Sequence, residues 1–274
     1  MPQLQKARGR DNHINKKTVE KLHPDEVQRL YEAARSRVLL LDYEGTLVDP
    51  DLPAADDHLD RLMGELAQDA RNSIVVLSDL PVTRFSDRFA DLRITVVAES
   101  GGFARGSRGQ WQTPGDLYML WKEPVTAALR RLASRYPNTT IDERYFSVRW
   151  NFGGGIDHLS ESDQRQLKAA FRIMSGRYNV PMIETHGSIE FRAPDISKSK
   201  FVASWMSLHG HCDFILAIGD DRTDEEIFDL IGRKYLTVRI GHDSASKACY
   251  YLPSRSDVLP LLKGLTKATK PMDS

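Results

Sequence analysis

The segment Val38–Leu47, which reads VLLLDYEGTL, constrains the fold more than any other part of this chain. A short apolar run of β-prone residues ends on Asp42, and Glu44 and Gly45-Thr46 follow directly. A buried parallel strand that carries carboxylates to its C-terminal end has this pattern, and α/β proteins place their chemistry at that edge. Gly45 permits a sharp turn, which leaves the Thr46 hydroxyl and the adjacent amides free to bind an anion. An ordinary strand that ends in a polar turn would look similar, so the other motifs must decide between the two interpretations.

Other apolar strands alternate with amphipathic helices on both sides of this segment. The predicted strands span residues 73–78, 94–98, 214–218 and 236–240, and the predicted helices span residues 23–35, 57–70, 82–89, 198–208, 223–231 and 258–265. Strands that alternate with helices favour a parallel sheet with right-handed crossovers. We therefore expect an α/β protein with a Rossmann-like, parallel-sheet core.

The pattern changes in the middle of the chain. Helices are predicted over residues 117–136 and 160–178, each followed by two strands, over residues 140–145 and 146–152 and over residues 182–185 and 189–191. This repeated helix–strand–strand order predicts a separate α+β unit inserted into the α/β domain. The expected domains are a flexible leader at 1–26, an α/β core at 27–113 and 194–265, a cap at 114–193 and a tail at 266–274.

Composition argues against several classes of protein. Lys+Arg and Asp+Glu both total 38, so no excess of basic residues predicts a nucleic-acid partner. Cys212 and Cys249 are too few for a disulfide framework and fit a reducing, cytoplasmic location. No apolar run has the length of a membrane span, and the polar N-terminus does not resemble a secretory signal. We expect neither a nucleic-acid nor a membrane partner.

Polar residues follow several of the predicted core strands, and parallel strands bring their carboxyl ends to one edge of the sheet. The residues expected to meet there are Asp42, Glu44, Ser78 and Lys198, together with the run Gly219–Glu225, which reads GDDRTDE and contains Asp220 and Asp224. Three or more carboxylates that converge without Cys or His favour a hard cation, and Mg²⁺ is the natural choice. The sequence therefore predicts a magnesium site at this edge.

Such a site can receive a phosphoryl group, because the metal and a lysine offset the charge on its oxygens while an aspartate attacks in line. Asp42 is the predicted nucleophile, and Glu44 is the acid that protonates the leaving sugar oxygen. Thr46, Ser78 and Lys198 are the predicted phosphate ligands.

The predicted metal ligands are the side chains of Asp42 and Asp220 and the backbone carbonyl of Glu44, with Asp224 orienting a metal-bound water. Simpler interpretations exist for individual residues. Asp220 could only cap the following helix, and a Ser or Lys at the position of Ser78 or Lys198 is common in any α/β protein.

The combined motifs resemble those of the haloacid dehalogenase superfamily, and within it those of trehalose-6-phosphate phosphatases. The family's Asp-Tyr-Asp-Gly-Thr-Leu corresponds to Asp42–Leu47, and its Gly-Asp-Asp-Arg-Thr-Asp-Glu is intact at Gly219–Glu225. Its Glu-Val-Arg-Pro corresponds to Glu190–Ala193, with Lys198 eight residues after the Glu. The resemblance covers residues 27–265 and is highly specific, because several motifs match together.

This resemblance implies a Mg²⁺-dependent phosphatase that hydrolyses a sugar phosphate, with trehalose 6-phosphate as the leading substrate. It also implies substrate contacts from Glu99, Arg144, Glu190 and Arg192. Glu190 and Arg192 could instead form a cross-strand arrangement on the surface of the cap hairpin. The helix that contains Tyr31–Arg35 looks like the linker to a trehalose-6-phosphate synthase domain, so a synthase domain or subunit is an expected partner.

Four departures from the family pattern affect the expected sugar site. Glu44 replaces the general-acid Asp, and Asp79-Leu80 stands where the family has Gly-Arg. Ser100 replaces a His, and Asn151-Phe152-Gly153 replaces His-Tyr-Arg. These changes keep the phosphate and metal groups but remove cations from the disaccharide site. A phosphatase-like domain with weak or no activity that regulates trehalose synthesis is therefore the alternative hypothesis.

Overall fold

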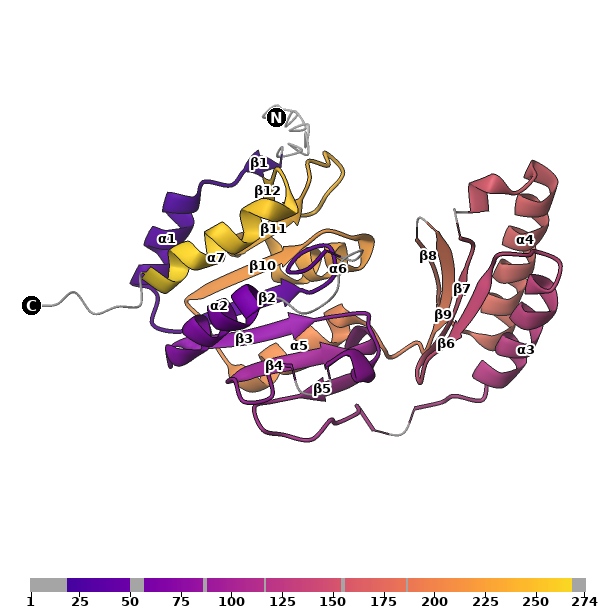
Figure 1. The fold of residues 1–274 in the computed structure, drawn as a ribbon, viewed down its shortest axis with the longest axis horizontal. Helices are drawn as coiled ribbons and strands as arrows, with labels where there is room; N and C mark the ends of the chain where they lie inside the picture. The colour runs from indigo at the N-terminus through magenta and orange to yellow at the C-terminus, as the bar shows by residue number, and fades with distance from the viewer. Residues whose placement is uncertain are drawn as a thin grey trace, which may run out of the picture.

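The computed structural model describes residues 19–49, 57–85, 88–115, 117–153, 156–185 and 187–267. Two lobes, each with its own β-sheet, form the molecule (Figure 1). The larger sheet has eight strands in the order β1-β12-β11-β10-β2-β3-β4-β5. Its strands span β1 (Glu20–Lys21), β2 (Arg37–Asp42), β3 (Asn72–Leu77), β4 (Ile94–Ala98), β5 (Phe103–Arg105), β10 (Phe214–Gly219), β11 (Leu236–Ile240) and β12 (Tyr250–Leu252). All neighbouring strands pair in parallel except β4 and β5, which confirms the predicted α/β core.

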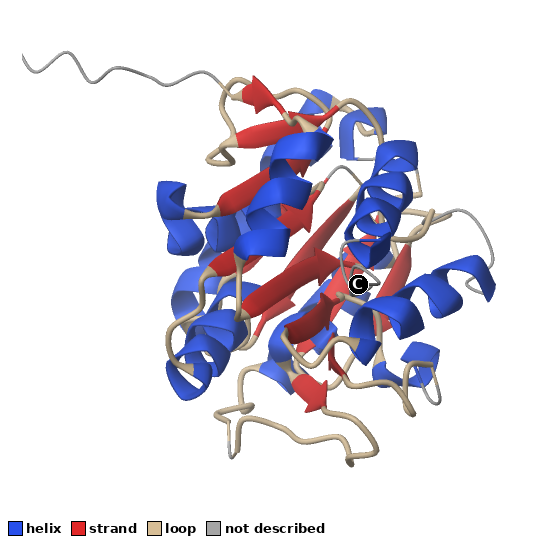
Figure 2. Ribbon diagram, turned by 90° about the vertical axis from the view of Figure 1, so that its left-hand side faces the viewer, coloured by secondary structure: helices blue, strands red, loops and turns tan. Residues whose placement is uncertain are grey.

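Helices cover both faces of this sheet, so its central strands are buried on both sides (Figure 2). One face packs on α1 (Pro24–Ala33), α2 (Asp57–Gln68) and α7 (Val258–Lys267), and the other packs on α5 (Lys198–His209) and α6 (Arg222–Ile231). In β2, Leu39 and Leu41 point to the first layer, while Val38 and Leu40 point to the second. This double burial explains why the strand reads as a continuous apolar run.

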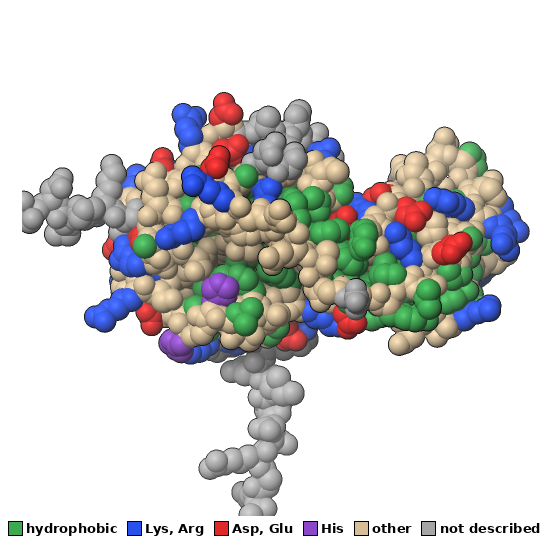
Figure 3. All heavy atoms as spheres, turned by 90° about the horizontal axis from the view of Figure 1, so that it is seen from below, with side chains coloured by type: hydrophobic (Ala, Val, Ile, Leu, Met, Phe, Trp, Pro, Cys, Tyr) green, Lys and Arg blue, Asp and Glu red, His purple; other side chains and the backbone are tan. Residues whose placement is uncertain are grey.

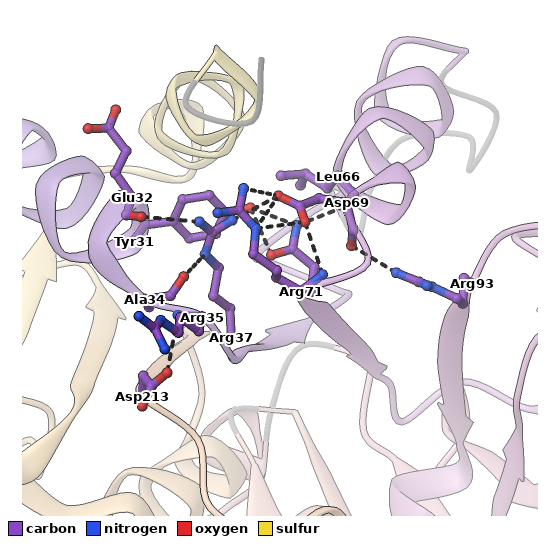
Figure 4. Close-up of polar contacts among 11 residues, drawn as sticks. Tyr31, Glu32, Ala34, Arg35, Arg37, Leu66, Asp69, Arg71, Arg93 and Asp213 are labelled. Carbon is purple, nitrogen blue, oxygen red and sulfur yellow. Dashed lines mark hydrogen bonds and ion pairs between the residues drawn. The ribbon is translucent and has the colours of Figure 1, made fainter. Parts of the chain in front are cut away.

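A buried arginine at the start of β2 connects the C-terminal ends of two helices to the beginnings of two strands (Figure 4). The side chain of Arg37 is 0% exposed, and its Nη1 lies 3.0 Å from Asp69 Oδ2. The Arg37 Nε donates to the carbonyl of Ala34 at 3.1 Å, and its guanidinium lies 3.9 Å from the centroid of the Tyr31 ring. The Tyr31 hydroxyl in turn contacts the Asn72 side chain. These contacts link α1, β2, β3 and the end of α2 at the edge opposite the carboxyl ends of the strands.

The smaller lobe has a four-stranded antiparallel sheet in the order β6-β7-β9-β8. Its elements are α3 (Lys122–Ala133), β6 (Thr140–Glu143), β7 (Ser147–Asn151), α4 (Glu161–Tyr178), β8 (Met182–Thr185) and β9 (Ser188–Arg192). Alternate residues of this sheet, such as Val148, Trp150 and Phe191, form one apolar cluster with α3 and α4. The opposite face of the sheet is turned toward the larger lobe (Figure 1). We call the larger lobe the core and the smaller lobe the cap.

Two predicted helices are shorter in the structure. The helix predicted over residues 117–136 is α3, which begins only at Lys122. Before it, Leu117 and Met119 are half-buried while Tyr118 and Leu120 are 68% and 77% exposed, and this alternation is that of an extended chain. The helix predicted over residues 82–89 is a single 3₁₀ turn at Val82–Phe85, and residues 86–87 lie outside the described part of the chain.

Three short strands were absent from the sequence prediction, namely β1, β5 and β12. β1 pairs in parallel with β12, and α1 begins at Pro24, so residues 20–26 belong to elements of the core although the prediction placed them in a leader. Residues 1–18 of that leader and the tail from residue 268 lie outside the described part of the chain.

Seen from below, the molecule shows exposed hydrophobic side chains around the junction of the two lobes (Figure 3).

Among the described residues, no helix has the length and apolar character needed to cross a bilayer. Cys212 and Cys249 are both free thiols.

Candidate active site

Three buried charged side chains meet where β2 and β10 end and where α5 begins. Asp42 is the last residue of β2, Lys198 is the first residue of α5, and Asp224 lies in the first turn of α6. Each is at most 2% exposed. Lys198 Nζ lies 2.6 Å from Asp42 Oδ1 and 3.3 Å from Asp224 Oδ1. Residues that are separated by up to 182 positions in the chain are therefore brought together at the predicted sheet edge.

Carboxylate oxygens of Asp42, Asp220 and Asp224 all lie within 4.8 Å of one another. Two glycines make this approach possible, because a Cβ at Gly45 would overlap the Asp220 carboxyl and a Cβ at Gly219 would overlap the Asp224 carboxyl. The described residues offer Asp42 Oδ2 no hydrogen-bond partner, although it is buried. An unpartnered buried oxygen in a cluster of three acids fits a site for a hard divalent cation.

The electrostatics of the cluster also fit a cation. Burial raises the pKa of Asp42 well above its ordinary value, and the nearby Asp224 raises it further. Burial likewise raises the pKa of Asp224 to about 7, although Lys198 opposes this shift. Burial would lower the pKa of Lys198, but the carboxylates of Asp224 and Asp42 raise it well above its ordinary value. The acids outnumber the lysine, so a divalent cation would relieve their mutual repulsion.

Helix capping does not account for Asp220. The N-cap of α6 is Asp221, whose Oδ1 accepts hydrogen bonds from the backbone N–H groups of Thr223 and Asp224. Asp224 completes a capping box, because its Oδ2 accepts from the backbone N–H groups of Asp220 and Asp221. Asp224 thus holds the loop in place, while the Asp220 carboxylate remains available to the acid cluster.

The predicted general acid and one predicted phosphate ligand are bonded to each other. Ser78 Oγ donates to Glu44 Oε2 at 2.6 Å and accepts from the Leu80 N–H at 2.9 Å. Burial raises the pKa of the Glu44 carboxyl, and the neighbouring Asp79 raises it further. The Thr46 hydroxyl is fully buried and has no hydrogen-bond partner among the described residues. The structure therefore places Glu44, Thr46 and Ser78 around the end of β2, as the sequence predicts.

On the cap, the sheet face turned toward the core carries a buried ion triad. Glu190 Oε2 lies 2.6 Å from Arg149 Nη2, and Glu190 Oε1 lies 2.8 Å from Arg192 Nε. Glu190 and Arg192 are only 2% and 3% exposed, so they are not a surface pair. Burial alone would raise the pKa of Glu190, but the two arginines hold it below its ordinary value.

Arg149 was not predicted as a site residue. It lies directly opposite Glu190 in the β7–β9 ladder. The alternation of polar and apolar residues in Ser147–Asn151 would have placed Arg149 on the polar face, once β7 was paired with β9.

Glu99 and Arg144, which were predicted to bind substrate, connect the two lobes in this structure. Glu99 Oε2 accepts from the backbone N–H groups of Tyr145 and Phe146 in the cap, at 3.0 and 3.4 Å. Arg144 donates to the backbone carbonyl of Asp79 in the core and to Asp142 Oδ2. Their side chains are thus engaged at the junction of the lobes, and their roles in substrate binding stay predictions.

Burial would raise the pKa of the Asp79 carboxyl. The cations Lys198, Arg192 and Arg149 instead hold it well below its ordinary value, and the Ser100 hydroxyl donates to it. Asp79 therefore places a negative charge between the core site and the cap triad.

Comparison with known proteins identifies the family. A family model described as trehalose-phosphatase matches residues 40–256. The alpha,alpha-trehalose-phosphate synthase (UDP-forming) B of Dictyostelium discoideum is 26% identical over 262 residues, which are 92% of this chain and 33% of that protein. The chain spans between 24% and 33% of the length of the curated relatives it matches.

Two solved structures from Candida albicans have the same fold. The trehalose-6-phosphate phosphatase C-terminal domain has a TM-score of 0.78 at 21% identity and covers 91% of this chain and 98% of its own. The trehalose synthase regulatory protein C-terminal domain has a TM-score of 0.68 at 16% identity and covers 89% of this chain and 99% of its own. These likenesses bear out the expected fold, a mostly parallel α/β core with an inserted cap. Because the family match covers most of its length, the chain belongs to the trehalose-phosphatase family.

Proposed function

We propose that this protein is a Mg²⁺-dependent phosphatase that hydrolyses a sugar phosphate, with trehalose 6-phosphate as the leading substrate. The observation that carries this proposal is Asp42 Oδ2, a buried carboxylate oxygen with no hydrogen-bond partner among the described residues. The other oxygen of Asp42 is fixed by Lys198. An oriented, buried carboxylate oxygen beside a lysine is the arrangement that a nucleophile for phosphoryl transfer requires.

In the proposed reaction, Asp42 Oδ2 attacks the phosphorus in line with the bond to the sugar oxygen. The phosphorus–oxygen bond to the sugar breaks, and Glu44 gives its proton to the departing oxygen. Water then gives a proton to the Glu44 carboxylate and attacks the phosphorus of the aspartyl phosphate. The bond between phosphorus and Asp42 breaks, which regenerates Asp42 and releases inorganic phosphate. The raised pKa of Glu44 supports its role, because burial favours the protonated form that a general acid needs.

The residues that would hold Mg²⁺ are Asp42, Asp220 and the backbone carbonyl of Glu44, with Asp224 reaching the ion through water. When bound, the ion would offset the negative charge that these carboxylates and the phosphoryl oxygens share. Lys198, Ser78 and Thr46 would bind the remaining phosphoryl oxygens. The unpartnered Thr46 hydroxyl supports this assignment, since a buried hydroxyl needs a hydrogen-bond partner.

The cap supports a hydroxyl-rich leaving group. Glu190 can accept hydrogen bonds from sugar hydroxyls, and Arg149 and Arg192 can donate to them, from the sheet face that looks toward the core. Trehalose 6-phosphate is the leading substrate because the matching family is that of trehalose-phosphatases and because one C. albicans neighbour is a trehalose-6-phosphate phosphatase domain. The same relatives support a role in trehalose synthesis.

Phosphate release from trehalose 6-phosphate, glucose 6-phosphate and mannose 6-phosphate, with and without Mg²⁺, tests the proposal. We expect release from trehalose 6-phosphate that requires Mg²⁺ and disappears in Asp42→Asn. Arg233→Gln, at an exposed position beyond α6, is the matched control and should retain full activity. Release by Asp42→Asn at the parent rate would refute the assigned nucleophile.

A regulatory domain is the second candidate function, and two observations favour it. Glu44 stands at the general-acid position, and one neighbour is the C-terminal domain of a trehalose synthase regulatory protein. This candidate predicts that the protein binds trehalose 6-phosphate, or a trehalose-phosphate synthase, without releasing phosphate. Calorimetric binding without turnover would favour it over the enzyme.

A further inference from the structure

An open cleft of about 750 Å³ lies between the cap and the helix N-termini of the core. Its cap side is formed by Pro181, Met182 and Ile183 at the edge strand β8, and its core side is formed by the first turns of α5 and α6. Arg192 and Lys198 also line it, so it adjoins the proposed phosphoryl site. This volume is ample for a ligand of the size of a hexose phosphate.

The cleft contains one cation without an intramolecular partner. Arg222, the first residue of α6, is exposed, and its side chain makes no hydrogen bond or ion pair with any other residue in the described ranges. The backbone N–H groups at this helix end already donate to the capping Asp221. The guanidinium of Arg222 is therefore the group that this end of α6 offers to an anion.

Two further lysines line the cleft, and their ion pairs are exposed to solvent. Lys200 Nζ donates to the backbone carbonyl of Pro194 at 2.6 Å and lies 3.6 Å from Asp195, with exposures of 55% and 74% for the Lys200 and Asp195 side chains. Lys247 Nζ lies 2.8 Å from Asp229, with exposures of 51% and 66%. Exposed pairs of this kind contribute little free energy, so an anion in the cleft can compete for both lysines.

The acids that line the cleft are engaged elsewhere. Glu225 accepts hydrogen bonds from Arg239, from the Ser246 hydroxyl and from the Lys247 backbone N–H. Glu226 accepts from the Ser199 hydroxyl. Neither acid pairs with Arg222, so its guanidinium remains available to a ligand.

We propose that this cleft binds a second phosphate-type anion beside the scissile phosphoryl group, with Arg222 as its main contact. This inference rests on the proposed function only for the position of the first phosphoryl group at Lys198. The second anion is either part of a doubly phosphorylated sugar or a free inorganic phosphate. The chemistry is the same in both cases, since a guanidinium binds phosphate oxygens through paired hydrogen bonds.

Calorimetric titration of the full chain carrying Asp42→Asn, in Mg²⁺ and at low salt, tests the inference without turnover. The ligands are fructose 6-phosphate, fructose 1,6-bisphosphate, and fructose 6-phosphate in the presence of inorganic phosphate. We expect the second anion to raise the affinity for the fructose phosphate about three- to tenfold over fructose 6-phosphate alone. The gain should be seen in one of two arms, either with the bisphosphate or with added inorganic phosphate. A gain for the bisphosphate indicates a covalently attached group, and a gain with added phosphate indicates a separate anion.

The gain should vanish when Arg222→Gln is added and should persist when Arg233→Gln is added instead. The absence of a gain in both arms, or a gain that survives Arg222→Gln, would overturn the inference. The proposed function can fail independently, because it fails if the parent chain with Asp42 releases no phosphate from any sugar phosphate. An Arg222-dependent gain would then still establish the second anion site.

Discussion

At the scale of single residues, the proposed role of Glu44 as the general acid depends on its contact with Ser78. Its extra methylene, compared with the family's aspartate, carries the carboxyl onto the Ser78 hydroxyl at 2.6 Å. Ser78 is itself a proposed phosphate ligand. In this arrangement its hydroxyl donates to Glu44 instead of to a phosphate oxygen. The contact also holds the longer side chain in one place, which reduces the looseness that an additional rotatable bond would otherwise introduce.

We expect Glu44→Asp to increase kcat/KM for the true substrate several-fold, up to about tenfold. The shorter side chain should release Ser78 to the phosphate and place its carboxyl closer to the position used by related phosphatases. Steady-state kinetics of the parent and the variant provide the measurement. A slower variant would show that the pocket is built around the longer side chain and that the glutamate is not an impairment.

Asp42→Asn should lower kcat by at least about a thousandfold with a much smaller effect on substrate affinity. The amide keeps the shape of the side chain and can still contact Lys198, but it cannot attack phosphorus. Single-turnover phosphate release and calorimetric affinity for the same sugar phosphate separate the two effects. Loss of affinity in proportion to the loss of rate would indicate a binding role for Asp42.

The residues of the proposed site could be predicted to different degrees. Asp42, Asp220 and Asp224 stand out because each lies at or just after the end of an apolar strand, and the sheet rule brings such ends together. Arg149 could not be found in this way, because its partner Glu190 is 41 residues away and the pairing depends on the register of β7 against β9. The contacts of Glu99 with the cap backbone depend likewise on how two lobes meet.

At the scale of elements, central strands were predicted well and edge elements poorly. β2, β3, β4 and β10 contribute residues to the apolar clusters on both faces of the sheet, so burial makes most of each strand apolar. β1, β5 and β12 have only two or three residues each, and their pairing with neighbours defines them more than their own composition. The extended residues before α3 read as helical because their apolar side chains continue into the helix.

The Arg37–Asp69 network links several helices and strands. Its contribution to the free energy of unfolding should depend on pH. The hydrogen bond from the Arg71 side chain is the largest influence on Asp69 and, with Arg37, lowers its pKa from 3.8 to about 2. The folded protein therefore keeps this carboxylate ionised where the unfolded chain binds a proton. Its contribution, on the order of 1–2 kcal/mol, should be complete above about pH 4 and disappear as the pH falls toward 2.

Asp69→Asn should lower the free energy of unfolding at pH 7 by about 2–3 kcal/mol, because it leaves the buried Arg37 guanidinium without its ion pair. Urea denaturation over a series of pH values would measure this loss and its decline in acid. Asp91→Asn is the control, since Asp91 pairs with Arg108 at 3.7 Å with both side chains at least 80% exposed. An equal loss in the two variants would contradict a special role for the buried network.

At the scale of the whole molecule, the cap is an insertion, since the chain leaves the core after β5 and returns to it at α5 (Figure 1). Each lobe has its own apolar cluster, so the lobes can change their relative position without breaking either core. The polar contacts between them include Arg144 with the Asp79 carbonyl and Glu99 with the cap backbone. Closure over a bound sugar would exclude water from the phosphoryl site and bring Glu190 and Arg192 to the ligand.

Small-angle scattering can test this motion. With Mg²⁺, trehalose and orthovanadate as a phosphoryl mimic, we expect the radius of gyration of the parent chain to decrease. Arg144→Ala should raise the radius of gyration of the free protein, because it removes a bond between cap and core. Arg130→Ala is the control, since Arg130 pairs with Glu143 within the cap at 2.9 Å and should leave the lobe arrangement unchanged. The contrary outcome is a radius of gyration that does not change on ligand binding, together with normal turnover by Arg144→Ala. It would mean that the lobes act as one rigid body and that substrate reaches Asp42 through the cleft as it stands.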